Sequence, residues 1–282
     1  MASFGNLAAT PFALCCHCAI HVDMTALVAL AALSAFAAAR PEIVGGTEVP
    51  MGQFKYVASL RKTESGPTLC GGTLIAPTKI LTAASCVDTS TNYASIGSHF
   101  SRGDKDGERI KIVNRIVHPK FNQTTLDNDF AILHLASKSK FDPIALSWDA
   151  IEPGTMSWVL GFGWPSFSED FLEGVEVLGE NSPVLLRAAF NTWSNGECQN
   201  AVGDEAKISE SRLCAAAAGK SPCYGDTGGP LIINRGGVEY VAGVTSWDSV
   251  CDSKYPSVYS RVSVAREFIQ PHLAVAATQP EN

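Results

Sequence analysis

Three short segments of the chain carry side chains that could take part in acyl transfer. They are LTAASC, which contains Ser85, DNDFAIL, which contains Asp129, and CYGDTGGP, which contains Thr227. A hydroxyl group attacks a carbonyl carbon only when a neighbouring base accepts its proton. Ser85 cannot accept that proton at neutral pH, and a carboxylate such as that of Asp129 is too weak a base. The three segments therefore contain two hydroxyls and a carboxylate, but no base for a nucleophile.

Together with IVGG, which begins at Ile43, these segments resemble the motifs of trypsin-like serine proteases, from Ile43 to about Leu273. In that family the first segment reads TAAHC and the third reads GDSGGP. The resemblance therefore places Ser85 at the histidine position and Thr227 at the nucleophile position, and only Asp129 of the triad is retained. Loss of either nucleophile or base costs on the order of 10⁶ in kcat in subtilisin. We predict a chain without protease activity.

No other feature of the sequence supplies the missing base. His134 lies five residues beyond Asp129 on the same predicted strand, about 16 Å away at roughly 3.3 Å per residue. His118 precedes a proline in a predicted surface turn, and His99 has no motif around it. A threonine nucleophile in other enzymes uses a terminal amine, and none is expected beside position 227. We expect Asp129 to be a structural hydrogen-bond acceptor, with Ser85 as a candidate donor.

The resemblance also assigns an oxyanion hole and a specificity pocket. The backbone N–H groups of Gly225 and Thr227 correspond to the oxyanion-hole donors, which do not make a protease without a nucleophile. Ser221 is at the base of the pocket, and Asp248 and Ser257 occupy wall positions that are commonly glycine in trypsin-like members. Side chains there should narrow or close the pocket. Each of these changes, taken alone, also fits a shift in substrate specificity. Because they occur together with both triad losses, we favour the interpretation that selection for catalysis is relaxed in this chain.

Activation in this family depends on an ion pair whose two partners are present. Cleavage before IVGG frees the amine of Ile43, which pairs with the acid before the nucleophile, here Asp226. The preceding segment, residues 40–42, reads RPE and is interpreted as a short pro-segment, although a trypsin-like activating protease finds no basic residue at its end. A buried Asp226 without a partner would cost several kcal/mol. We therefore expect the mature chain to start at Ile43.

The N-terminus carries the pattern of a secretion signal. Residues 24–39, MTALVALAALSAFAAA, are uncharged and end in small residues. They are shorter than the roughly 20 residues that span a bilayer. We interpret residues 1–39 as an extension followed by a signal peptide, with Met1 or Met24 as the start. A zinc site at CCHC, residues 15–18, is disfavoured because the usual spacing of cysteine ligands is absent.

Six cysteines follow the signal segment, and an even number in a secreted chain suggests three disulfides. Spacing alone permits 15 pairings. The family resemblance implies three of them: Cys70 with Cys86, Cys198 with Cys214, and Cys223 with Cys251. A sequon at Asn122, followed by Gln123 and Thr124, makes a surface loop a candidate for N-glycosylation.

Composition and charge limit the class of protein and of partner. The chain has 282 residues, 46% of them hydrophobic and 17% charged, which is enough for a large core or two small ones. Its 24 glycines, 15 prolines and short apolar runs favour an all-β architecture. The formal charge is −7, and −6 without residues 1–39, whose one charged residue is Asp23. This argues against nucleic acid or an anionic membrane as partner, and no metal or cofactor is predicted.

The resemblance implies two packed six-stranded antiparallel β-barrels with a short C-terminal helix. The barrels are expected at about residues 43–148 and 149–272, before a tail of residues 273–282, with polar sequence at 147–153 as the boundary. Strands are predicted at residues 108–117, 129–135, 157–163 and 184–191, and a hairpin around Arg235, Gly236 and Gly237. The helix is expected to be capped by Ser263, to present Val264 and Phe268 on one face, and to end near Pro271.

A subgroup of the family is similar in detail. The stretches KDGERIKIV (105–113) and GDTGGPLI (225–232) resemble the glucanase inhibitor proteins secreted by oomycete plant pathogens. That resemblance implies binding and inhibition of a host endo-β-1,3-glucanase in the plant apoplast, although no interface residue can be carried over. Two alternatives stay open: a protease-like protein that binds another secreted partner, and a hydrolase with a noncanonical site.

Overall fold

The computed structural model describes residues 43–88, 90–164, 180–247, 251 and 254–273. They belong to one compact unit that begins at Arg40. The predicted signal segment, the CCHC cysteines and Asp248 lie outside the described residues. Within the described ranges, no helix is both long enough and apolar enough to cross a membrane.

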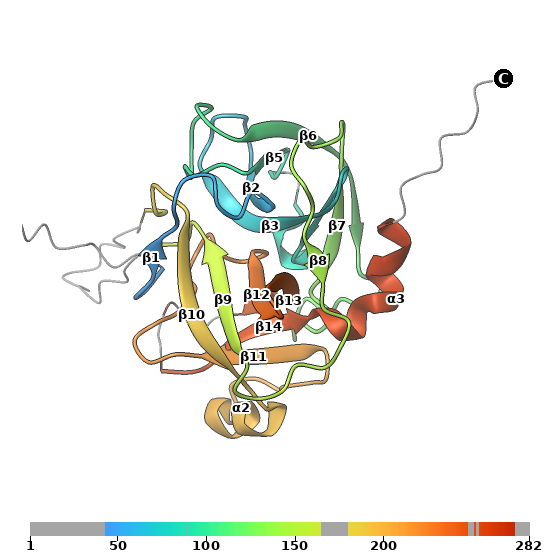
Figure 1. The fold of residues 1–282 in the computed structure, drawn as a ribbon. Helices are drawn as coiled ribbons and strands as arrows, with labels where there is room; N and C mark the ends of the chain where they lie inside the picture. The colour runs from blue at the N-terminus through green and yellow to red at the C-terminus, as the bar shows by residue number, and fades with distance from the viewer. Residues whose placement is uncertain (1–42, 89, 165–179, 248–250, 252–253, 274–282) are drawn as a thin grey trace, which may run out of the picture. The chain divides into compact units, whose positions relative to one another are not determined.

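Six antiparallel strands form the first barrel, which closes in the order β2-β3-β4-β7-β6-β5 (Figure 1). Its core consists of aliphatic side chains from every strand, among them the fully buried Leu60, Leu74, Ile80, Ile96 and Leu133. The strands are β2 (Val57–Arg61), β3 (Thr68–Ala76), β4 (Lys79–Thr82), β5 (Tyr93–Ile96), β6 (Glu108–Val117) and β7 (Ala131–Leu135).

A second barrel follows, in which each strand pairs antiparallel with the next in the order β9-β10-β11-β14-β13-β12 and β12 pairs back with β9. Two short strands extend it: β1 (Thr47–Glu48) pairs with β10, and β8 (Ala145–Leu146) pairs with β13 in parallel. The expectation of two six-stranded antiparallel barrels is confirmed. The second set is β9 (Met156–Gly161), β10 (Leu186–Trp193), β11 (Arg212–Ala216), β12 (Pro230–Arg235), β13 (Val238–Trp247) and β14 (Ser257–Arg261).

An apolar core joins the two barrels. Leu81, Phe130 and Ile132 from the first barrel share one cluster with Leu160 and Val244 from the second, and all five are fully buried. Burial of apolar surface stabilises the folded state by about 25 cal/mol per Å². The contact between the barrels is therefore stabilised by burial of apolar surface, as the core of each barrel is.

The local predictions for strands agree well with the structure, and those for helices less well. β6 has the predicted limits, and the β12–β13 turn has Gly236 and Gly237 at φ of 60° and 88°, the left-handed conformation of a tight hairpin. Helix α2 (Asn195–Val202) was not predicted. Its capping box, Ser194 with Glu197, was the available signal, but Gly196 and the weak apolar periodicity obscured it.

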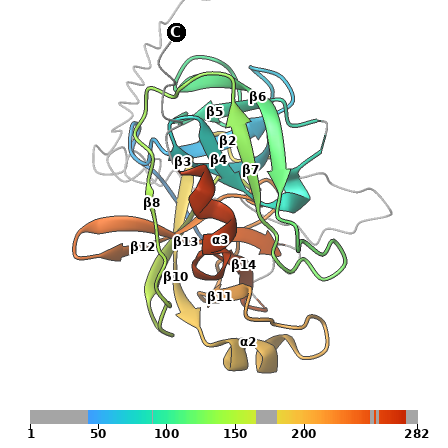
Figure 2. The same cartoon turned by 90° about the vertical axis from the view of Figure 1, so that its right-hand side faces the viewer.

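The C-terminal helix is short, as predicted, but it is built differently. It comprises η2 (Val262–Ala265), α3 (Arg266–Ile269) and η3 (Gln270–His272), and both views place α3 beside β7 (Figure 2). Ser263 lies inside η2 and is not the cap, and Val264 is exposed while Phe268 packs on the core. The predicted i, i+4 face is wrong because η2 has three residues per turn.

A fully buried guanidinium organises the loop between β5 and β6. Arg61 donates to the backbone carbonyls of Phe100 and Gly103, both at 2.8 Å, to that of Glu64 at 3.4 Å, and to the hydroxyl of Ser59 at 2.9 Å. Burial, together with the charge of Arg109, lowers the pKa of Arg61 to about 10. The side chain thus stays charged at neutral pH and holds the loop through oxygen atoms of the main chain.

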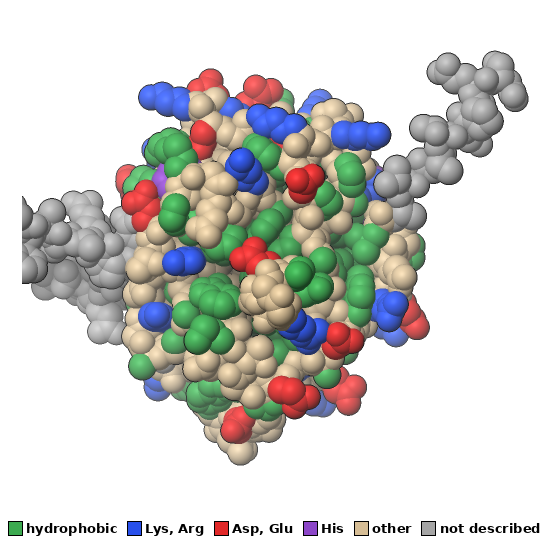
Figure 3. All heavy atoms as spheres, viewed as in Figure 1, with side chains coloured by type: hydrophobic (Ala, Val, Ile, Leu, Met, Phe, Trp, Pro, Cys, Tyr) green, Lys and Arg blue, Asp and Glu red, His purple; other side chains and the backbone are tan. Residues whose placement is uncertain are grey.

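Charged side chains are mixed in sign on one face of the molecule. On the face shown in Figure 3, basic groups are interspersed with acidic ones and no extended basic stripe is visible. A nucleic-acid-binding surface would gather lysine and arginine on one face.

Three histidines pack around the C-terminal helix. The ring of His118 lies 4.7 Å from that of Phe268, which lies 5.8 Å from that of His272, and His272 lies 6.0 Å from His134 on β7. Burial lowers the pKa of all three imidazoles. The positive charge of Lys79 lowers those of His134 and His272 further, and Lys120 does the same for His118.

These shifts predict acid sensitivity. Each pKa is below 6.5 in the folded chain, so the unfolded chain binds more protons once the pH falls below that value. The free energy of unfolding should therefore decrease as the pH is lowered from about 7 to 5. Replacing Lys79 with Met removes one cause of the low pKa of His134 and His272 and should flatten this dependence, measured as Tm against pH. The exposed Lys62→Met variant is the matched control, and equal slopes for the two variants would contradict the explanation.

Candidate functional site

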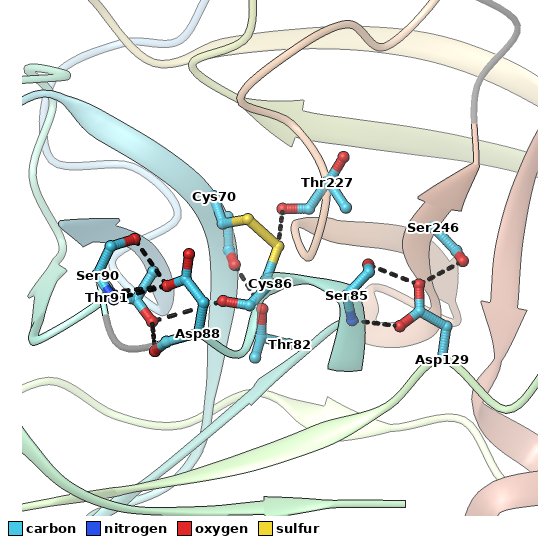
Figure 4. Close-up of a disulfide and its surroundings, with 11 residues drawn as sticks. Cys70, Thr82, Ser85, Cys86, Asp88, Ser90, Thr91, Asp129, Thr227 and Ser246 are labelled. Carbon is cyan, nitrogen blue, oxygen red and sulfur yellow. Dashed lines mark hydrogen bonds between the residues drawn. A yellow bond between two sulfur atoms is a disulfide. The ribbon is translucent and has the colours of Figure 1, made fainter. Parts of the chain in front are cut away.

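A buried carboxylate lies where the two barrels meet. Asp129, which precedes β7, is fully buried, and its Oδ1 accepts a hydrogen bond from the backbone N–H of Ser85 at 2.7 Å. Its Oδ2 accepts from the hydroxyls of Ser85 at 2.9 Å and Ser246 at 2.6 Å (Figure 4). Ser85 lies on the turn η1 (Ala84–Cys86) and Ser246 near the end of β13. Both barrels therefore contribute donors to one acid.

The burial and the hydrogen bonds of Asp129 are those expected of a structural hydrogen-bond acceptor. Burial raises its pKa, while the hydrogen bonds from Ser246 and Ser85 lower it, and burial dominates. None of its donors among the described residues is a histidine, and the ring of His134 lies against His272 instead. Ser246 cannot be recognised as a partner from local sequence patterns, because 117 residues separate it from Asp129.

Thr227 is held through its backbone and not through its side chain. Its carbonyl oxygen accepts the N–H of Gly71 at 2.7 Å. The sulfur of Cys86 lies 3.3 Å from the same oxygen, and because it is bonded in a disulfide it has no hydrogen to donate, so this is a packing contact. The hydroxyl of Ser85 points at Asp129 and not at Thr227 (Figure 4). In this arrangement Ser85 offers no proton acceptor to Thr227.

The loop around Thr227 depends on glycine. Gly225 and Gly228 have φ of 98° and 85°, in the left-handed region that disfavours side chains. A Cβ at Gly228 would lie 2.3 Å from the hydroxyl oxygen of Thr82, and one at Gly71 would lie 2.5 Å from the nitrogen of Gly229. Among the described residues, no acceptor is bonded to the N–H groups of Gly225 and Thr227, the two positions assigned to the oxyanion hole.

The carboxylate of Asp226 is bonded within the second barrel. It is fully buried, and its carboxylate accepts the backbone N–H groups of Gly163 at 2.7 Å and Cys223 at 2.9 Å. Ile43 is also fully buried, with a φ of 45°, an unfavourable value for a β-branched residue. The next residue, Val44, forms an antiparallel bridge with Ser221. The IVGG segment is thus inserted beside the pocket position.

The described pocket positions are enclosed. Ser221 and Ser257 are 1% and 4% exposed, and the hydroxyl of Ser221 donates to the carbonyl of Pro222 at 2.9 Å. Asp248, the third assigned position, lies outside the described residues.

Three disulfides brace the unit, and they are the pairs that the resemblance implied: Cys70–Cys86, Cys198–Cys214 and Cys223–Cys251. The first ties η1, which carries Ser85, to β3, and the third anchors the segment before Thr227. Disulfides of this kind persist in oxidising compartments. In the described part of the chain, no group of three or more His, Cys, Asp or Glu side chains could hold a metal ion.

Asn122 lies exposed in the loop before β7. Its Oδ1 accepts the N–H groups of Thr124 at 2.9 Å and Thr125 at 3.1 Å. The side-chain nitrogen, which a glycan would modify, is left without an acceptor among the described residues.

Comparison with known proteins agrees with this geometry. Residues 43–269 match the family model described as trypsin. The chain belongs to the trypsin family. Within it, the chain is 36% identical over 258 residues to glucanase inhibitor protein 2 of Phytophthora sojae, covering 87% of this chain and 85% of that protein. It is 37% identical to glucanase inhibitor protein 3 of P. sojae strain P6497 (86% and 94% covered) and to glucanase inhibitor protein 3 of P. infestans (86% and 93%).

The hydrogen bond from Ser85 to Asp129 predicts a stability effect. Replacing Ser85 with Ala removes one donor from a fully buried carboxylate and should lower the free energy of unfolding by about 1–3 kcal/mol in urea denaturation. The matched control is Ser90→Ala, whose hydroxyl donates to Asp88 at an exposed site. The control should change stability by less than about 0.5 kcal/mol. Equal losses in the two variants would show that the Ser85 bond contributes nothing beyond a surface contact.

Proposed function

We propose that this protein is a secreted, catalytically inactive member of the trypsin family that binds and inhibits an endo-β-1,3-glucanase of a host plant. The observation that carries the proposal is the role of Ser85. At the position where an active family member has its base, this side chain donates a hydrogen bond to Asp129. Among the described residues, no group that could activate the hydroxyl of Thr227 is bonded to it, and we infer that the protein acts by binding.

The partner is inferred from relatives. Curated relatives that resemble this chain over most of its length are named glucanase inhibitor proteins. A fold does not by itself determine a function, so the names support the glucanase only in combination with the lost catalytic positions. The three disulfides and the apolar segment at residues 24–39 support secretion, with the plant apoplast as the expected compartment.

The remaining assigned positions are part of this proposal. We assign Gly225 and Thr227 to a remnant oxyanion hole, and Ser221, Asp248 and Ser257 to a narrowed remnant of the specificity pocket. Asn122 is proposed as a glycosylation site. None of these groups needs to act chemically in a protein that functions by binding.

The function is tested by mixing purified protein with a plant endo-β-1,3-glucanase. We expect a complex in size-exclusion chromatography at micromolar protein and slower hydrolysis of laminarin at saturating substrate. Chymotrypsinogen, which shares the fold, serves as the control and should do neither. Unchanged hydrolysis with no complex would remove the glucanase as partner and leave the alternative of another secreted partner. A fluorophosphonate probe that labels active-site serines should label trypsin and not this protein; labelling at Thr227 would favour a noncanonical hydrolase.

The N-terminus of the secreted chain gives a separate test. We propose that processing frees the amine of Ile43, because this residue is buried with an unfavourable φ and the family pairs this amine with Asp226. Mass spectrometry of the secreted protein should identify Ile43 as the first residue. Finding Arg40 there would refute this processing.

A further inference from the structure

Two adjoining grooves lie on the second barrel, one on each side of Trp193. The first, of about 470 Å³, extends from Gly154 to Glu197, and the second, of about 430 Å³, extends to Tyr255. Asn191 and Trp193 line both grooves. Each volume is within the range of about 300–1,000 Å³ that is usual for small-molecule sites. Because two residues are shared, a long ligand in one groove would continue past Trp193 into the other.

Small apolar and aromatic side chains line the second groove. Three successive alanines, Ala216 to Ala218, line it together with Trp193 and Tyr255. Trp193 is fixed from behind, since it packs against the cluster that contains the Cys198–Cys214 disulfide. Aromatic rings with a polar edge suit ligands that have both an apolar face and hydrogen-bonding groups. The ring faces of pyranoses have this character.

The backbone N–H and C=O groups of the strand beside the grooves are already paired within the fold. Asn191 and Thr192 pair with Ala216 and Ala215 of β11, and Thr192 also exchanges hydrogen bonds with Gly154 and Thr155. A peptide that adds as a strand needs a free edge of a sheet. The groove therefore favours recognition by side chains and ring stacking over recognition of an extended peptide.

The charge of the two grooves is balanced. One acid, Glu197, lines the first groove, and one base, Lys254, lines the second, where its Nζ lies 4.9 Å from the ring centre of Tyr255. Phosphate or sulfate ligands require clustered cations or bidentate arginine, and neither is present among the lining residues. An uncharged, polyhydroxylated ligand fits the observed lining.

We propose that the two grooves form one binding site for a linear, uncharged oligosaccharide. Sugar rings stack on Trp193 and Tyr255 beside the three alanines. Hydroxyl groups of the ligand bond to the side chains of Asn191 and Glu197. The choice of a β-1,3-linked glucan as ligand rests on the proposed function, since a glucanase inhibitor works beside this polymer. The site lies outside all the positions assigned by the family resemblance.

The test is a titration of the protein with laminarihexaose, followed by calorimetry, with no glucanase present. We expect saturable binding with a Kd below about 1 mM, and binding of laminaribiose at least about tenfold weaker because a disaccharide occupies one groove only. Tyr255→Ser and the surface variant Ala218→Arg should each weaken binding at least about tenfold. The matched control is Tyr224→Ser, an exposed tyrosine that lines neither groove, which should bind as the unmodified protein does.

Three outcomes would overturn the site: no saturation with laminarihexaose, equal loss in the Tyr255 and Tyr224 variants, or unchanged binding in Ala218→Arg. The titration separates this inference from the proposed function. If the glucanase is inhibited while laminarihexaose does not bind, the groove assignment alone fails. If laminarihexaose binds while the glucanase is neither bound nor inhibited, the proposed function alone fails.

Discussion

The junction between the two barrels depends on the need of one buried carboxylate for hydrogen-bond donors. Asp129 is fully buried, and an ionised group in such a place is tolerated only when its oxygens are bonded. Its donors come from both barrels, Ser85 from the first and Ser246 from the second. Serine at the proposed histidine position satisfies this need by donating a hydrogen bond to the acid, as the N–H of a histidine would, but a hydroxyl is too weak a base to accept a proton from a nucleophile.

Contacts other than those of the Ser85 and Thr227 side chains also hold the two barrels together. β3 and the loop around Thr227 meet backbone to backbone, through the N–H of Gly71 and the close approach of Gly71 to Gly229. The disulfide Cys70–Cys86 fixes η1 beside them. Replacing a catalytic side chain removes chemistry without removing any of these contacts. A family member can therefore lose catalysis while its surface stays ordered enough to bind a partner.

Motifs that depend on local backbone geometry were the most predictable from sequence. The hairpin glycines at 236 and 237 and the extended run of β6 could be recognised, because left-handed turns and extended strands each restrict the residue types. Helix α2 was missed because tertiary packing and a cap stabilise it more than its own propensity. Ser246 was missed for a different reason: its role arises from a contact between distant segments, which no local pattern encodes. The incorrect face of the C-terminal helix came from assuming α periodicity where the chain starts with a 3₁₀ turn.

The buried guanidinium of Arg61 has a consequence for how this surface can diversify. It holds the loop between β5 and β6 through the main-chain carbonyls of Phe100 and Gly103, and carbonyls are common to every amino acid. The outward side chains of that loop, such as Asp104 and Lys105, are therefore uncoupled from the anchor beneath them. Substitutions there can accumulate without loosening the loop, so that a single rigid support can display a changing set of side chains.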